Sequence, residues 1–255
     1  MSTPRWLTAI QNALAQHEKQ TGTFLLPLTC SASHYHPVIQ LATIATDTVT
    51  PQARSHVVRS FIVPPNAPSL PLIVTTTDIR VPKVSQINLN PHVHIVHWIE
   101  GTQEQFRFAG RAVIVPSPNH ALYQHFVDVI AKQRENGSYG IAALVDSSFD
   151  WEKQRINIFK SLSGHMRASW CRPVPGSPLT GGEEEAKKWP VRLEEPGVDS
   201  DEESKSDWET ALINFALLVI DPYECDYLEL GVVPDRRTKF SRTEDGDWKE
   251  EALVP

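Results

Sequence analysis

Two short segments of the sequence combine cations with a strand-like pattern. Residues 54–59 read Arg-Ser-His-Val-Val-Arg, with a guanidinium at each end of a short apolar stretch. In a later segment Gln105, Arg107 and Arg111 fall on one side of a predicted strand and phenylalanine on the other, because side chains alternate between faces. Guanidinium groups suit phosphate or carboxylate ligands, since their N–H forks match those oxygens. Charges on solvated strand edges have the same pattern, and on composition alone that second interpretation is favoured.

The elements that must position these residues crowd into the stretch 72–111. Residues 72–77 are β-branched and apolar, which predicts a buried strand. Asp78 can cap a following short helix, and Pro82 fits the first turn of that helix. Asn90 precedes a proline and therefore ends the helix.

The rest of the chain alternates short strands with a few helices. Helices are predicted at about 3–21, 119–134 and 150–161, and strands at 38–45, 92–98, 105–115, 215–221, 224–230, 238–243 and 248–254. The strands 92–98 and 105–115 form a hairpin around Gly101. This order predicts a mainly β fold, an antiparallel barrel decorated by helices, rather than a doubly wound sheet.

Composition excludes several classes of protein. With 255 residues, 40% hydrophobic and 22% charged, the chain has the composition of a soluble globular protein. The longest apolar run, 215–220, is too short to span a bilayer, and the first residues lack a signal pattern. The three cysteines are scattered singly, so neither a disulfide framework nor a zinc site is indicated. No basic patch suggests nucleic acid, and we expect a cytoplasmic protein, with the nucleus as an additional location.

Five histidines are spaced closely enough to be candidate metal ligands. His34 and His36 are close together, as are His92, His94 and His97. On a strand His97 faces away from the other two, so no triad forms there. Surface or core histidine is the preferred interpretation, and no metal is expected.

The segment 181–209 differs from the rest. It holds eleven acidic and four basic residues, a difference of −7 that equals the net charge of the whole chain. Such a segment buries little apolar surface, which predicts a mobile acidic insertion at about 176–210 within a single domain 1–255. A recognition segment for a basic partner is the alternative, and a solvated loop is favoured.

Six segments, in this order along the chain, resemble those of a known protein family. They are RSHVVRSF (54–61), TTTDIRVPKVSQINLNPHV (75–93), EQFRFAGRA (104–112), SLSGHMRASWCRP (161–173), FALLVIDPYECDYLELGVVPDRRTKF (215–240) and DWKEEALVP (247–255). Together they resemble the FMN-binding split barrels of the pyridoxamine 5′-phosphate oxidase class, in a branch broader than the vitamin B6 enzyme. The resemblance implies an antiparallel split β-barrel, FMN as cofactor, and a homodimer with FMN at the interface.

The same resemblance implies roles for individual residues. Arg54 and Lys83 would meet the FMN phosphate, with Ser163 adding a bond. The other implied cofactor contacts are Val57, Val58, Arg59, Thr76, Thr77, Gln105 and Lys239. Tyr123, Arg236 and Arg237 are the candidate substrate residues, and the sequence identifies no catalytic residue.

The sequence also departs from the family pattern. Arg59 takes the place of a lysine, Pro82 of an arginine, and Leu228 of a tryptophan that packs on the flavin. Residues 235–237 read Asp-Arg-Arg where the vitamin B6 enzymes carry Arg-x-His. Two functions therefore remain open, an FMN-dependent oxidoreductase that uses a small-molecule substrate or electron donor, and a non-catalytic module that binds, senses or stores FMN.

Overall fold

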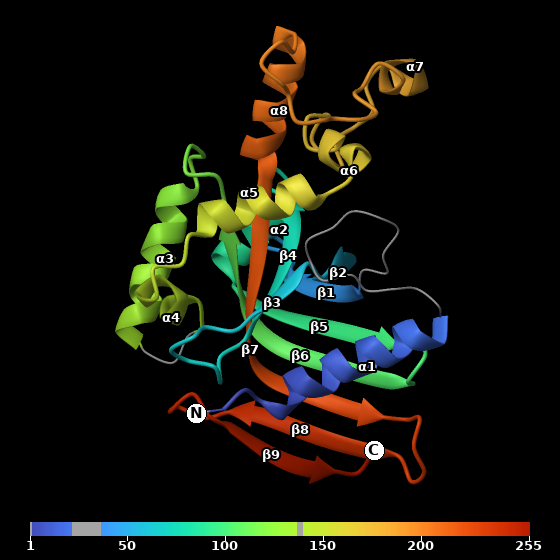
Figure 1. Ribbon diagram of the computed structural model, residues 1–255, viewed down its shortest axis with the longest axis vertical. Helices are drawn as coiled ribbons and strands as arrows, with labels where there is room; N and C mark the ends of the chain where they lie inside the picture. Colours follow the sequence, from blue (N-terminus) through green and yellow to red (C-terminus); the bar gives the residue numbers. More distant parts are fainter. Residues whose placement is uncertain (1, 22–36, 137–139) are drawn as a thin grey trace.

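One antiparallel sheet organises the fold (Figure 1). The computed structural model describes residues 2–21, 37–136 and 140–255. Within these ranges the nine strands are β1 (Val38–Ile44), β2 (Pro51–Val57), β3 (Ser60–Ile62), β4 (Leu72–Asp78), β5 (His92–Ile99), β6 (Glu104–Val115), β7 (Phe215–Glu229), β8 (Arg236–Arg242) and β9 (Trp248–Leu253). Their order is β2-β1-β5-β6-β7-β4-β3, with β8 paired to β7 and β9 to β8. The sheet is open rather than closed, which confirms the predicted antiparallel split barrel with helices.

Helices lie against both faces of this sheet. In the described ranges they are α1 (Arg5–Thr21), α2 (Pro82–Leu89), α3 (Tyr123–Asn136), α4 (Gly140–Asp146), α5 (Trp151–Ser161), α6 (Gly164–Ala168), α7 (Gly182–Ala186) and α8 (Glu202–Asn214). Two apolar clusters result. The first joins α1 and α2 to one face, and the second joins α3, α4, α5 and α8 to the other. None of the described helices is long and apolar enough to cross a membrane.

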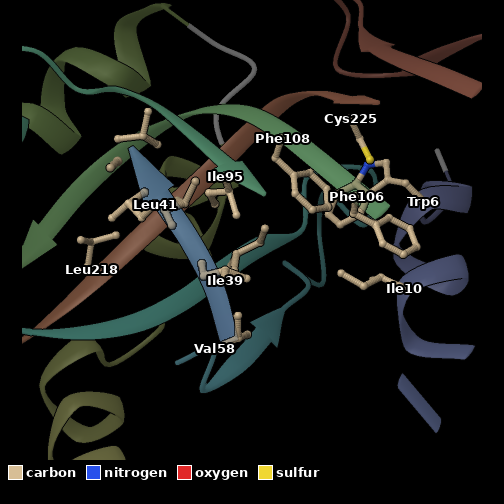
Figure 2. Close-up of a cluster of buried hydrophobic side chains, with 14 of the residues drawn as sticks. Trp6, Ile10, Ile39, Leu41, Val58, Ile95, Phe106, Phe108, Leu218 and Cys225 are labelled. Carbon is tan, nitrogen blue, oxygen red and sulfur yellow. The ribbon is translucent and has the colours of Figure 1, made fainter. Parts of the chain in front are cut away.

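Helix α1 closes the first cluster. Figure 2 shows Trp6 and Ile10 of this helix beside Phe106 and Phe108 of β6. Trp6 is fully buried, and its ring meets that of Phe108 edge-on at 5.1 Å between centroids. Alternation along β6 therefore puts Gln105 and Arg107 on the opposite face of the sheet, away from this cluster.

Helix α2 is short, and buried apolar side chains hold it in place. Val84 and Ile87 are both buried in the first cluster. Pro82 opens the helix as predicted, while Asn90 at its end is extended. This anchoring places Lys83 and Gln86 over β1 and β2.

Asp78 does not cap this helix, contrary to the prediction. The N-cap position is Val81, which has no side-chain capping bond. Asp78 instead accepts a hydrogen bond from the backbone N–H of Arg80 at 2.9 Å and pairs with its guanidinium at 2.6 Å. Because the Asp78 carboxylate is already bound by Arg80 within this turn, it does not cap the helix.

The segment 215–230 is one strand rather than the two predicted. Pro222 was interpreted as part of a turn, but it lies within β7 opposite Gly110 of β6, where the register shifts. A Cβ on Gly110 would lie only 2.9 Å from the carbonyl oxygen of Asp221. The absence of a side chain at this position lets the two backbones approach, so the strand continues through the proline as a bulge.

One helical boundary also differs from its prediction. Helix α3 begins at Tyr123 rather than near residue 119, because Ser117 and His120 accept hydrogen bonds from Asn119 and Leu122 in local turns.

In the acidic segment, α8 is an ordered element with Trp208 and Ala211 buried. The mobility of the remainder of that segment stays a prediction.

The anchoring of α2 can be tested with a pair of substitutions. Ile87→Ala should lower the free energy of unfolding by about 2–5 kcal/mol, because it leaves a cavity in the first cluster. Leu89→Ala is the matched control on the same helix, since Leu89 is 74% exposed, and should change it by less than about 0.5 kcal/mol. Urea titration followed by circular dichroism measures both, and equal effects would contradict the packing of α2.

Candidate phosphate-binding site

Arg54 lies on β2 within a network of neutral groups. It is directly opposite Leu41 of β1, and Gln52 is opposite Thr43, so all four share a face of the sheet. The Arg54 Nη1 donates to Thr43 Oγ1 at 2.6 Å and to the Gln52 carbonyl at 2.9 Å. Its Nη2 donates to the side-chain oxygens of Gln52 and Gln86, both at 3.3 Å. These contacts fix the guanidinium without neutralising it.

Lys83 of α2 reaches the same strand through a histidine. Its Nζ lies 3.1 Å from Nε2 of His56, and Nδ1 of that ring lies 3.3 Å from Thr75 Oγ1 on β4. The Thr75 hydroxyl is 3.4 Å from the carbonyl oxygen of Leu218. Like Arg54, Lys83 therefore meets a neutral partner.

Burial and mutual repulsion make these charges unfavourable. Burial, followed by the charge of Arg54, lowers the pKa of Lys83 to about 8, although Asp78 acts in the opposite direction. Burial, followed by the charges of Lys83 and Arg54, lowers the pKa of His56 to about 3, so the imidazole is neutral at physiological pH. Burial also lowers the pKa of Arg54. Each shift is of the kind that a bound anion would reverse.

Arg59 is a third cation, located just beyond the end of β2. Its backbone N–H donates to the Val74 carbonyl at 2.7 Å, which joins this segment to β4. The side chain is 8% exposed, and its Nε has no hydrogen-bond partner among the described residues. Burial lowers the pKa of this guanidinium to about 10. An unsatisfied buried guanidinium N–H is costly, which indicates that a further acceptor belongs there.

Arg54 and Lys83 lie close enough for the charge of Arg54 to lower the pKa of Lys83, and together they form a cationic region. In the described part of the chain, no carboxylate lies within ion-pair distance of Arg54, Arg59 or Lys83. Asp78, whose charge Lys83 senses, is already paired with Arg80. Positive charges taken out of water are stabilised only by a nearby negative charge, so the arrangement suits an anion such as a phosphate.

Other predicted cofactor residues lie on the opposite face of the sheet. Gln105 of β6 is opposite Leu228 of β7, which in turn is opposite Arg237 of β8. Lys239 shares this face but forms a 2.9 Å ion pair with Glu224, which raises its pKa through the hydrogen bond to that carboxylate. Lys239 and Arg237, the predicted flavin and substrate contacts on this face, therefore have acidic partners. The cations near β2 differ, because their partners are neutral.

Arg237 illustrates this difference. Its Nε and Nη2 donate to the two carboxylate oxygens of Asp226 at 2.9 and 2.8 Å. Arg107 lies 3.6 Å from the same carboxylate. Asp226 therefore holds both guanidinium groups on the exposed face, and neither is a free anion-binding group in this arrangement.

Comparison with known proteins finds a family model that is similar to the first part of the chain. A model of the pyridoxamine 5′-phosphate oxidase FMN-binding domain matches residues 3–116, which include Arg54, Arg59 and Lys83. Residues 3–116 are therefore similar to a domain described as FMN-binding. No curated protein matches the chain.

Two solved structures are similar to this chain over its whole length. A pyridoxamine 5′-phosphate oxidase-related, FMN-binding protein from Nostoc punctiforme is 25% identical, with a TM-score of 0.64 and full coverage of both chains. PhzG from Burkholderia lata, solved with tetrahydrophenazine-1-carboxylic acid, is 14% identical with a TM-score of 0.51. The alignment with PhzG covers all of this chain and 94% of that one, and it shows the fold alone.

The remaining predicted FMN contacts lie in three places. Val57 is the last residue of β2, and Val58, just beyond it, is buried in the first cluster. Thr76 and Thr77 end β4 on opposite faces, and the Thr77 carbonyl accepts from the Trp170 indole at 3.2 Å. Trp170 itself packs against Phe159 and Phe215 as a core residue. Ser163 is exposed and caps α6 by accepting from Met166 N–H.

The predicted substrate residues are not brought together. Tyr123 lines a hollow of about 390 Å³ between α3 and α5 whose walls are mainly apolar, including Phe126 and Val127. Arg236 is exposed on β8, and Arg237 is held by Asp226 as described. His34 and His36 lie outside the described residues. In the ranges that are described, no group of three potential metal ligands is present.

The structure also supplies residues that the sequence did not indicate. His56 was visible only as the middle of the segment 54–59, and Gln86 only as a polar residue of a predicted helix. Thr43 donates to Gln86 Oε1 at 2.6 Å within the buried network. Their common signal, a buried polar side chain beside a cation, exists only once β1, β2 and α2 are assembled.

Proposed function

We propose that the chain binds FMN and holds its phosphate with the cations beside β2 and α2. The observation that carries this proposal is that two partly buried cations, Arg54 and Lys83, have neutral partners, while Nε of the buried Arg59 has no hydrogen-bond partner among the described residues. A phosphate dianion matches both their charge and their N–H donors. The family domain that contains all three residues supports FMN as the source of that phosphate.

We further propose that the bound flavin serves an oxidoreductase acting on a small molecule. A flavin supplies hydride or electron transfer at its ring, and the protein supplies binding, orientation and exclusion of water. In this role Arg54 and Lys83 anchor the phosphate end, while the end of β4, with Thr76 and Thr77, flanks the cofactor. The alternative, a non-catalytic FMN-binding or storage module, is favoured by the lack of an assembled substrate-binding set around Tyr123 and Arg237.

Efficient oxidation of pyridoxamine 5′-phosphate is not part of the proposal. That substrate needs a second phosphate-binding group, yet Arg237 is held by both oxygens of Asp226. Asp235 stands nearby where the family pattern places a cation. The Tyr123 hollow offers mainly apolar walls. Another small substrate therefore fits these residues better.

The sheet geometry supports a homodimer as the working unit. Arg54 shares a face with Leu41 of the first cluster, whereas Gln105 and Lys239 lie on the opposite face. Three strand-to-strand steps separate β2 from β6, about 14 Å at the usual spacing. One chain cannot direct both sets at one flavin. Two copies related by a twofold axis can, with Gln105 and Lys239 of one chain completing the site of the other.

Exposed apolar groups on that second face fit a protein interface. Val38, Val96 and Trp98 are 41%, 36% and 38% exposed and alternate with buried residues of β1 and β5. They share their face with Gln105, which is directly opposite Trp98. Covering this surface with a second copy would remove apolar area from water.

The phosphate assignment predicts a specific loss of FMN. The purified protein should be yellow with FMN and should reject FAD. Arg54→Ala and Lys83→Ala should each weaken FMN binding roughly ten- to hundredfold, because each removes a charge-assisted hydrogen bond. Riboflavin, which lacks the phosphate, should bind equally to wild type and variants. Fluorescence titration measures these affinities.

The control for this experiment is Lys188→Ala, which removes an exposed lysine paired with Glu185 and should leave FMN affinity unchanged. Stoichiometric FMN in the Arg54→Ala, Lys83→Ala double variant would overturn the phosphate site. A protein that cannot be reconstituted with FMN at all would overturn the proposed function.

The interface predicts that one apolar substitution separates the dimer. Val96→Glu should give monomers and release FMN, because it places a charge on the covered face. Val191→Glu is the matched control, since Val191 is 64% exposed and lies outside this face. Light scattering on the FMN-loaded proteins reports the mass. A wild-type monomer that retains FMN would contradict the shared site.

The catalytic proposal predicts anaerobic bleaching of the flavin by a small-molecule donor. NAD(P)H and a panel of amines are the probes, and at least one should bleach the yellow protein. Pyridoxamine 5′-phosphate should do so poorly, because the second phosphate-binding group is missing. Absorbance near the flavin maximum gives the rates. Failure of every donor would favour the binding module, and rapid formation of pyridoxal 5′-phosphate would contradict the exclusion of that substrate.

A further inference from the structure

His56 occupies the centre of the cationic region without being a cation. It is 5% exposed, and its side chain lies between Lys83 of α2 and Thr75 of β4. It faces the same side of the sheet as Ile39, its direct partner on β1. The ring is therefore held on both nitrogens.

The partners of the ring decide where its proton lies. Nε2 is 3.1 Å from the Lys83 ammonium, which can only donate, so Nε2 accepts. The proton then lies on Nδ1 and is donated to Thr75 Oγ1 at 3.3 Å. The Thr75 hydroxyl keeps its own hydrogen for the Leu218 carbonyl at 3.4 Å. The chain of donors thus runs in one direction, from Lys83 to the backbone of β7.

We propose that His56 is the positioning residue of the phosphate site: it holds the Lys83 ammonium in place and keeps it charged for the anion. This inference rests on the proposed function, since the anion is the phosphate of FMN. His56 itself does not bind the ligand. It acts through Lys83, and Thr75 orients it.

A neutral acceptor suits this position better than other side chains would. A carboxylate beside Lys83 would neutralise the ammonium and repel the incoming phosphate. An apolar side chain would leave a half-buried ammonium without an acceptor, which disfavours its charged form. A neutral imidazole gives the ammonium a partner and leaves the net positive charge in place.

The neighbouring charges keep the imidazole neutral over the working range of pH. Lys83 and Arg54 face it, and together with burial they lower its pKa to about 3. Lys83 in turn faces Arg54 and Asp78 besides His56, and its own pKa is about 8. In the FMN-free protein the site therefore loses charge above pH 8, and FMN affinity should fall as pH rises through that value.

The first test measures Lys83 alone, in the FMN-free protein. Competitive acylation as a function of pH, read by mass spectrometry of the Lys83 peptide, gives the pKa of this lysine. His56→Phe should lower it by about one unit, because the ammonium loses its acceptor. His56→Gln restores an acceptor and should recover part of the shift. His125→Phe, at an exposed histidine, is the control and should leave the pKa unchanged.

The second test compares FMN with riboflavin on the same variants, after circular dichroism has shown that each is folded. His56→Phe should weaken FMN binding about tenfold at pH 7.5, leave riboflavin unchanged, and move the alkaline fall in FMN affinity to lower pH. Thr75→Val should act in the same direction with a smaller effect.

The outcomes separate the two proposals. An unchanged Lys83 pKa in His56→Phe, or equal losses of FMN and riboflavin, would overturn the positioning role. Wild-type protein that binds FMN no more tightly than riboflavin would overturn the proposed function. In that case the acylation experiment would still decide whether His56 controls Lys83.

Discussion

Positive charge that is buried without a negative partner is the constraint on which the site depends. Burial lowers the pKa of Arg54, Lys83 and Arg59. The side-chain partners of Arg54 and Lys83 are neutral, and Nε of Arg59 has no hydrogen-bond partner among the described residues. Such an arrangement reduces the stability of the free protein, because desolvated cations lack compensation. It increases the affinity for an anion by the same physical effect, since the ligand supplies the missing charge.

The rest of the fold holds these cations at fixed positions. Val84 and Ile87 bury one side of α2 in the first cluster, so Lys83 and Gln86 are directed at β1 and β2. Gln86 and Thr43 then hold the Arg54 guanidinium, and His56 holds Lys83. A preorganised set of donors loses little conformational entropy when the ligand binds, which favours tight binding.

The second face of the sheet follows a different rule. There Asp226 holds Arg237 and Arg107, and Glu224 holds Lys239, so positive and negative charges cancel locally. Exposed Val96 and Trp98 lie among them. Compensated charge around an apolar centre is typical of protein interfaces, whereas uncompensated buried charge is typical of a site for an anionic ligand. The two faces thus differ in how their positive charges are compensated.

The sequence by itself determined much of this protein. The alternation of apolar and polar side chains in 92–115, together with the turn at Gly101, specified the β5–β6 hairpin. The reason is that the two-residue period of side chains is a local property of strands. Pro82 and the residue before Pro91 specified α2, because proline acts on its own turn and on the residue before it. Six ordered segments specified the family resemblance, and through it Arg54, Lys83 and Arg59 as candidate ligands.

Only the tertiary structure decided what surrounds these residues. Pro222 looked like a turn, but the close approach of Gly110 let β7 continue past it, and that contact joins residues far apart in the chain. Lys239 and Lys83 are both single lysines in sequence, yet one meets Glu224 and the other meets His56. Charge compensation depends on distance in space, which local sequence does not encode. For this reason the sequence could name the cations, and the assembled sheet alone could show which of them have no counter-ion among the described residues.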